Sequence, residues 1–263
     1  MDGVIYVAVG PEHRALARQS RESLGRTNPG LAADLFTDCA CAIDHATFDR
    51  IHPVPDVHAR AKLDCLAMSR FERTLYLDCD TLVLAAFGDL FEVAERFDLA
   101  LAHDVRRRSA LVQEGLAEST PYAFPQLNSG VMLYRLSPAT RALFSDWARA
   151  FREAGVARDQ VVLKDLLWAS DLRFYVLPPE FNLRRVTMFD AWEPLDARPT
   201  ILHSHRLKDH LAGAEAVASL DRVLELERAA LLDEWRVHGL PRDRERAADE
   251  VLRVLLADVA GAG

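Results

Sequence analysis

Two aspartates, Asp78 and Asp80, interrupt an apolar stretch of the chain that reads RTLYLDCDTLVL at residues 73–84. Along an extended chain, side chains two positions apart point to the same side, so both carboxylates face one way and Cys79 faces the other. Two like charges held together are unfavourable unless a positive group lies between them. The spacing therefore predicts a site for a positive group, whose identity has to come from the rest of the sequence.

Strands and helices are predicted to alternate around this pair. Apolar runs predict strands at residues 4–9, 32–37, 74–77, 98–104, 127–136 and 199–205, and a strand that runs into a turn at 174–182. Helical spacing predicts helices at 14–24, 58–69, 87–97, 139–154 and 159–169. Alternation of this kind is typical of a mostly parallel central sheet covered by helices. We therefore expect an α/β fold with one domain at residues 1–208, followed by a helical extension at residues 209–263.

Four polar side chains fall at the predicted carboxyl ends of strands, namely Asp78, Asp80, Asp104 and His203. Ligands of open α/β sheets bind outside those ends, so we expect these residues to lie close together at a ligand site. Residues 105–124 carry charges, Gly and Pro with little periodicity, which predicts a long loop of the kind that is often functional.

Composition excludes several classes of protein. The formal net charge of −8 and a pI near 5.6 argue against a general nucleic-acid binder, which would show a basic surface. No apolar run is long enough for a membrane span, and the chain starts directly with a strand pattern rather than a signal segment. The four cysteines lack the spacing of a metal site, which predicts reduced thiols in a cytoplasmic protein. Abundant Ala, Arg and Leu indicate a bacterial source.

The letters DCDTL at residues 78–82 resemble the signature of haloacid dehalogenase-like phosphatases, in which the first Asp is a nucleophile and the second a general acid. That signature normally opens its domain, whereas two strands and two helices are predicted to come before it here. A convincing set of downstream partner residues for that chemistry is also missing from the sequence. We keep a phosphatase as the alternative interpretation.

Five segments, taken in order, resemble glycosyltransferase family 8, which includes glycogenin and bacterial lipopolysaccharide galactosyltransferases. They are ARAKLDCLAMSRFERTLYLDCDTLVL (59–84), LNSGVMLYRL (127–136), DQVVLKDLL (159–167), LPPEFN (177–182) and PTILHSHRLK (199–208). Each segment alone is unspecific, but five in the family's order are hard to explain by chance. The resemblance implies a GT-A fold and transfer of a sugar from a nucleoside diphosphate sugar, with UDP as the default nucleotide. A non-catalytic relative that only binds nucleotide sugars is the third hypothesis.

The resemblance implies that Asp78, Asp80 and His203 hold a divalent cation. Two carboxylates and an imidazole suit Mn²⁺, and carboxylates with water would suit Mg²⁺. His205 faces the same side as His203 on an extended chain, so either histidine could be the ligand, and we favour His203. Lys208, further along this segment, is expected to reach a phosphate of the donor.

Arg60 and Lys62 precede the metal-binding strand, on a predicted helix. Because they differ by about 200° around a helix, we expect only one of them to face the ligand, and we choose Arg60 for the phosphate or donor. The resemblance further implies that Asp104 and Asp159 contact the donor sugar, and that Asn128 contacts the donor or the acceptor.

Gln160 matches the residue closest to the reacting carbon in the family, which retains anomeric configuration. An amide is barely basic, so its carbonyl dipole, rather than a nucleophilic attack, would stabilise the positive sugar. Backbone groups of Val7, Ala8 and Val9 are expected to hold the base. The acceptor cannot be read from the sequence. Leucines at helical spacing in residues 209–260 predict packing on the domain or on a second copy, as in a homodimer.

Overall fold

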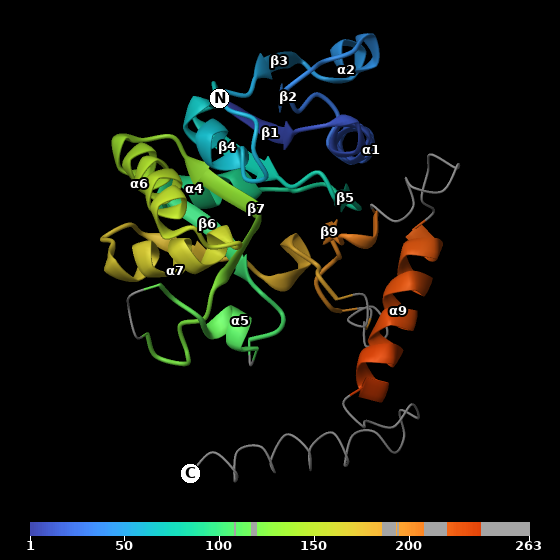
Figure 1. The fold of residues 1–263 in the computed structure, drawn as a ribbon. Helices are drawn as coiled ribbons and strands as arrows, with labels where there is room; N and C mark the ends of the chain where they lie inside the picture. The colour runs from blue at the N-terminus through green and yellow to red at the C-terminus, as the bar shows by residue number, and fades with distance from the viewer. Residues whose placement is uncertain (108, 117–119, 186–192, 194, 208–219, 238–263) are drawn as a thin grey trace. The chain divides into compact units, whose positions relative to one another are not determined.

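The structure, a computed structural model, describes residues 1–107, 109–116, 120–185, 193, 195–207 and 220–237 (Figure 1). The chain divides into two compact units, the first comprising Met1–Arg184 with Glu193–Val217 and the second Arg185–Trp192 with Ala218–Gly263. Among the described residues, the second unit contains one helix, α9 (Leu220–Val237). The first unit contains all the other elements and all the predicted site residues that the structure describes.

Two sheets form the first unit. The larger one contains β1 (Asp2–Ala8), β2 (Ala33–Thr37), β3 (Arg50–Pro53), β4 (Arg73–Leu77), β6 (Leu99–His103), β7 (Leu127–Arg135) and β8 (Phe174–Val176), in the order β3-β2-β1-β4-β7-β6-β8. The smaller one pairs β5 (Thr81–Val83) with β9 (Ile201–His203). Four of the six pairings in the larger sheet are parallel, and β7 runs antiparallel to both β4 and β6. The predicted α/β class with a mostly parallel sheet is confirmed.

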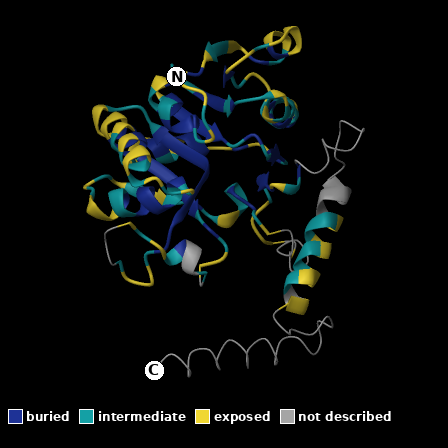
Figure 2. Cartoon of the chain, in the orientation of Figure 1, coloured by how far each residue is buried: buried dark blue, intermediate teal, exposed yellow. Residues whose placement is uncertain are grey.

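Helices cover this sheet. They are α1 (Pro11–Thr27), α2 (Ala42–Thr47), α3 (Lys62–Cys65), α4 (Val93–Arg96), α5 (Ala110–Gln113), α6 (Pro138–Ala154) and α7 (Asp159–Ala169), with 3₁₀ turns η1 (Leu66–Met68), η2 (Leu90–Glu92) and η3 (Pro179–Phe181). The strands are buried along most of their length, whereas the outer faces of the long helices are exposed (Figure 2).

The ends of α6 explain why it starts and stops where the sequence predicts. Ser137 is its N-cap and accepts a hydrogen bond from the Thr140 backbone N–H at 3.2 Å, while Pro138 takes the first helical position. Gly155 ends the helix with φ of 63°, a conformation that favours glycine. Trp147 on its inner face is fully buried, and its indole N–H donates to the Asp159 carbonyl at 2.8 Å, which fixes the start of α7 next to α6.

Three segments differ from the prediction. The helix expected at 58–69 is shortened to α3 and η1, and the helix expected at 87–97 is shortened to η2 and α4. The predicted loop at 105–124 contains the short helix α5. The elements α2 and β3 were not predicted at all. These are short elements, in which tertiary contacts rather than a repeating apolar pattern decide the backbone.

Candidate functional site

Strand pairing brings together the two aspartates and the histidine, which are far apart in the sequence. The Asp78 backbone N–H donates to the Gly130 carbonyl at 2.7 Å, which places the end of β4 beside β7. In the smaller sheet Thr81 lies opposite His203, and the Ser204 N–H donates to the Asp80 carbonyl at 3.0 Å. The ladder between β5 and β9 therefore sets His203 next to the aspartate pair.

The three side chains form a compact cluster. His203 Nε2 lies 3.4 Å from Asp80 Oδ1 and 3.7 Å from Asp78 Oδ2. One ligand atom from each residue lies within 4.8 Å of the others, which is a spacing that could hold a metal ion. A Cβ atom at Gly130 would overlap the His203 ring and lie 2.7 Å from Asp78 Oδ2. Only glycine fits this position, so the backbone of β7 forms one wall of the cluster.

A chain of hydrogen bonds orients the histidine. His203 Nδ1 lies 3.0 Å from Asn182 Oδ1, and Asn182 Nδ2 donates to Asn128 Oδ1 at 2.9 Å. Asn128 Nδ2 in turn donates to Asp104 Oδ2 at 3.4 Å. Since Asn182 presents its oxygen to Nδ1, that nitrogen donates the hydrogen bond, and Nε2 is the ring nitrogen that faces the carboxylates. All four residues are buried.

One oxygen of Asp78 is already occupied by protein donors. The buried Tyr76 hydroxyl donates to Asp78 Oδ1 at 2.5 Å, and Lys62 Nζ lies 3.4 Å from the same atom. The second oxygen, Oδ2, faces His203. Tyr76 and Lys62 thus fix the carboxylate so that a single oxygen points into the cluster.

Lys62 also joins the cluster to α7. Its ammonium donates to Ser129 Oγ at 3.0 Å and lies 3.5 Å from Asp159 Oδ2, while Arg60 Nε lies 3.4 Å from Asp159 Oδ1. Both cations line the cavity and lie close to the same carboxylate, although we expected only one of them to face the ligand. Arg60 lies in a turn ahead of α3, which begins at Lys62, so the angular spacing of a regular helix does not apply to the pair.

Charged groups in this network stay ionised. Burial alone would raise the pKa of Asp80, but the His203 imidazole lowers it well below its usual range. Burial opposes ionisation of Asp159 too, yet Lys62 and Arg60 lower the pKa of that carboxyl. For Lys62 itself, burial is outweighed by Asp159 and Asp78, which raise its pKa above the ordinary value.

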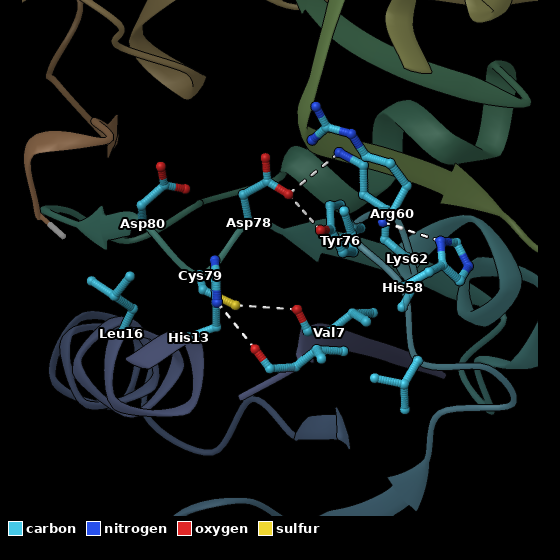
Figure 3. Close-up of a pocket in the computed structure, with 14 residues that line it drawn as sticks. Val7, His13, Leu16, His58, Arg60, Lys62, Tyr76, Asp78, Cys79 and Asp80 are labelled. Atoms are coloured by element: carbon cyan, nitrogen blue, oxygen red, sulfur yellow. Dashed lines mark hydrogen bonds and ion pairs between the residues drawn. The ribbon is translucent and has the colours of Figure 1, made fainter. Parts of the chain in front are cut away.

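A cavity of about 520 Å³ opens beside the aspartates (Figure 3). Asp78 and Asp80 point to one side of the chain and Cys79 to the other, as the spacing predicted, and the Cys79 thiol donates to the Val7 carbonyl at 3.2 Å. Burial and the two neighbouring carboxylates raise the pKa of this thiol well above its ordinary value, so it is not a thiolate. The wall combines apolar and charged groups, among them Val7, Val9, His13, Leu16, Arg60 and Lys62.

The structure describes the remaining predicted site residues except Lys208. Gln160 donates from Nε2 to the Leu127 carbonyl at 2.8 Å, next to the strand that carries Asn128. Ala8 is buried in β1, between the two valines that line the cavity. His205 is exposed and lies outside the cluster, whereas His203 lies within it. Lys208 falls outside the described residues.

Three residues that the network depends on have no site role predicted from the sequence. Asn182 ends the segment LPPEFN, but nothing in that segment indicates its contact with His203. Tyr76 is one of several large residues in a predicted strand, and nothing in the sequence indicates its hydrogen bond to Asp78. The helix predicted at 58–69 favours Arg60 over Lys62 for the ligand, so the contacts of Lys62 do not follow from the sequence. All four cysteines are free thiols.

Comparisons with known proteins agree on the family and the fold. Residues 73–210, more than half of the 263-residue chain, match the model of nucleotide-diphospho-sugar transferases. No curated protein matches the chain. The solved galactosyltransferase LgtC, in complex with donor and acceptor sugar analogues, is similar with a TM-score of 0.57 and 15% identity, over 84% of this chain and 98% of that one.

Two further solved structures share the fold. The glycosyltransferase GlyE of Streptococcus pneumoniae TIGR4 has a TM-score of 0.54 and 20% identity, over 91% of this chain and 65% of that one. Mouse xyloside xylosyltransferase 1 has a TM-score of 0.52 and 14% identity, over 78% and 98%. The expected resemblance to GT-A glycosyltransferases is confirmed, and the chain belongs to the family of nucleotide-diphospho-sugar transferases.

Proposed function

We propose that this glycosyltransferase uses a divalent cation, Mn²⁺ by preference, to transfer a sugar from UDP-sugar with retention of anomeric configuration. The observation that carries the proposal is the cluster of Asp78, Asp80 and His203 beside a charged cavity, in a chain of this family. Two carboxylate oxygens and one imidazole nitrogen are a ligand set that suits Mn²⁺, and Gly130 keeps the space open.

The residues fit such a cation in orientation as well as in type. Asp78 offers Oδ2 because Tyr76 and Lys62 occupy Oδ1, and His203 offers Nε2 because Nδ1 faces Asn182. When bound, the cation would act as a Lewis acid that stabilises the departing diphosphate, a contribution of several kcal/mol. Mg²⁺ would be a workable substitute.

In the transfer step, the bond between the sugar C1 and the diphosphate oxygen breaks, and a bond from C1 to the acceptor oxygen forms on the same face. The acceptor hydroxyl gives its proton to the departing phosphate oxygen. Gln160 would stabilise the positive sugar with its carbonyl dipole, since its Nε2 is held by Leu127. Asp159, kept ionised by Lys62 and Arg60, would hold donor hydroxyls close to that carbon.

The donor would lie along the cavity towards β1. Backbone groups of Val7, Ala8 and Val9 are proposed to hold the base, and Arg60 is proposed to contact the phosphates. Asp104 and Asn128, linked to each other at 3.4 Å, are proposed to bind hydroxyls of the donor sugar or the acceptor. Lys208 is retained as a proposed phosphate contact. UDP is chosen by resemblance to the family alone.

Release of the nucleoside diphosphate tests this proposal. The protein is incubated with UDP-, GDP-, CDP- and ADP-sugars, with Mn²⁺ or with EDTA, and the free diphosphate is measured alongside sugar transfer to a mixed acceptor panel. We expect one nucleotide class to be turned over only with the metal, and Asp78→Asn and Asp80→Asn both to be inactive. Hydrolysis of phosphomonoesters that survives Asp80→Asn but not Asp78→Asn would support the phosphatase alternative instead.

A further inference from the structure

Arg184 lies directly beside the proposed metal ligands, and the function proposed above gives it no role. Its backbone position is fixed by the preceding residue, because the Leu183 N–H donates to the Ile201 carbonyl at 2.8 Å and the His203 N–H donates to the Leu183 carbonyl at 3.0 Å. The side chain then reaches the histidine ring. Arg184 Nη1 lies 3.3 Å from His203 Nε2 and 3.4 Å from Nδ1.

The charge of Arg184 is not neutralised in the way that the other two cations of the site are. Lys62 is close to Asp78 and Asp159, and Arg60 is close to Asp159. Within the described part of the chain, Arg184 forms no ion pair with a carboxylate, and its buried Nε has no hydrogen-bond partner. Among the described residues its hydrogen-bonding contacts are with the imidazole, and Asp80, whose pKa it helps to lower, lies beyond ion-pair distance. A partly buried guanidinium held in this way is stabilised when an anion joins it.

Charge balance indicates which anion this is. Asp78, Asp80 and Asp159 carry three negative charges, whereas Lys62, Arg60, Arg184 and a divalent cation would together carry five positive ones. The excess positive charge suits a diphosphate, and among the described residues Arg184 is the cation of this group that has no carboxylate at ion-pair distance. Guanidinium groups bind phosphate oxygens with paired, charge-assisted hydrogen bonds that an ammonium cannot reproduce.

We propose that Arg184 binds an oxygen of the donor's diphosphate and is a determinant of nucleoside diphosphate affinity. The inference rests on the proposed function, and it adds a phosphate-binding residue on the side of His203. Arg184 acts on the nucleotide and not through the metal ligands. Loss of its charge should therefore weaken nucleotide binding while leaving the affinity for Mn²⁺ alone unchanged or slightly higher, because a positive neighbour is removed.

Calorimetric titration tests the proposal with the tightest binder among UDP, GDP, CDP and ADP, in Mn²⁺ buffer. We expect Arg184→Gln to weaken binding by on the order of tenfold or more, the loss of one charge-assisted hydrogen bond. Arg184→Lys should lose less, since it keeps the charge. Arg185→Gln, which changes the exposed neighbouring arginine, should bind as the parent does. Free Mn²⁺, measured by electron paramagnetic resonance without nucleotide, reports the metal site separately.

The outcomes are distinct. Equal nucleotide affinities for Arg184→Gln and Arg185→Gln would overturn the inference and leave the proposed function standing. A matching loss of Mn²⁺ affinity in Arg184→Gln would also overturn it, because Arg184 would then act through the metal ligands. If the parent binds none of the four diphosphates with Mn²⁺, the proposed function itself fails. Circular dichroism melts of each variant confirm that the fold is retained before binding is compared.

Discussion

Tyr76 orients the Asp78 carboxylate, and removing its hydroxyl tests how much this hydrogen bond contributes to metal binding. Its hydroxyl donates to Asp78 Oδ1 at 2.5 Å, and the phenol is almost fully buried, so the bond has no water to replace it. Burial and the adjacent carboxylate raise the pKa of Tyr76 well above its ordinary value, so it remains a donor at neutral pH. Residues that orient a metal ligand typically contribute ten- to a hundredfold to metal affinity.

We therefore expect Tyr76→Phe to weaken Mn²⁺ binding by roughly tenfold or more without unfolding the chain. Tyr134→Phe is the matched control, because Tyr134 is equally buried but donates to the Leu66 carbonyl, away from the metal ligands. A fluorescence or calorimetric titration with Mn²⁺ measures both. Equal affinities for the two variants would show that Tyr76 does not orient Asp78.

Asp44 provides a test of pH dependence away from the metal cluster. Its carboxylate accepts hydrogen bonds from the Cys41 N–H at 2.8 Å and from Arg18 at 2.6 Å, and its side chain is fully buried. Burial alone would raise the pKa of this carboxyl, but those donors lower it below its ordinary value. Because the pKa is lower in the folded state, the stabilisation is present above the unfolded pKa and is lost as the pH falls through the folded one.

We expect Asp44→Asn to unfold with a free energy about 1–3 kcal/mol smaller than the parent at pH 7. That difference should shrink as the pH is lowered through about 3.9, the ordinary aspartate pKa, and below it. Urea unfolding at a series of pH values measures both, with Asp146→Asn, at an exposed carboxylate, as the control. A difference that stays constant down to pH 3 would contradict the assigned direction of the pKa shift.

Single residues of the site were predictable when their type and spacing carried the chemistry. Asp78 and Asp80 are recognisable in the sequence because two adjacent carboxylates in an apolar strand are unfavourable without a positive group. His203 is recognisable because it lies at the carboxyl end of a predicted strand. Asn182 and Tyr76 do not stand out, since amides and phenols occur throughout folded proteins. Their roles depend on which strands become neighbours, and no local pattern contains that information.

Long elements were predictable from apolar periodicity, and short ones were not. The helices α1, α6 and α7 and the strands β1, β2, β4 and β7 lie close to their predicted ranges. The direction of β7 was not predictable, because apolar burial alone does not distinguish a parallel from an antiparallel neighbour. That direction matters, since the antiparallel pairing of β7 with β4 sets Gly130 against Asp78.

A substitution at Gly130 tests whether the metal cluster requires a residue without a side chain at this position of β7. A methyl group there would overlap the His203 ring and crowd Asp78 Oδ2, so we expect Gly130→Ala to reduce Mn²⁺ affinity by on the order of tenfold or more, as misplaced ligands do. Gly25→Ala in α1 is the control, because its added methyl would meet, among the described residues, only the flexible Arg21 side chain, and helix propensity favours alanine by about 0.5–1 kcal/mol.

Thermal unfolding of both glycine variants in metal-free buffer shows whether each one folds. Gly130→Ala should fold and bind Mn²⁺ weakly, while Gly25→Ala should bind Mn²⁺ as the parent does and melt at the same or a higher temperature. Parent-like Mn²⁺ affinity in Gly130→Ala would mean that the close approach of β7 is not required by the cluster.

Several properties of the complete chain stay predictions. The division at residue 208 into a catalytic domain and a helical extension lies in a stretch outside the described residues, as does most of the predicted extension, of which residues 220–237 are described. A homodimer through those helices, a cytoplasmic location and a bacterial source rest on the sequence alone. Among the described residues, no helix is both long and apolar enough to cross a membrane.

The central claim is that Asp78, Asp80 and His203 bind a divalent cation that in turn holds the diphosphate of the donor. Thermal unfolding tests this claim most directly. It is measured with UDP alone, with Mn²⁺ alone and with both together, for the parent, for Asp80→Asn and for the control Asp56→Asn, which changes an exposed carboxylate. We predict that the parent and the control gain about 2.7 kcal/mol at a hundredfold excess of UDP over its dissociation constant, only with Mn²⁺ present, and that Asp80→Asn gains far less. An equal gain in Asp80→Asn, or in the absence of metal, would contradict the claim.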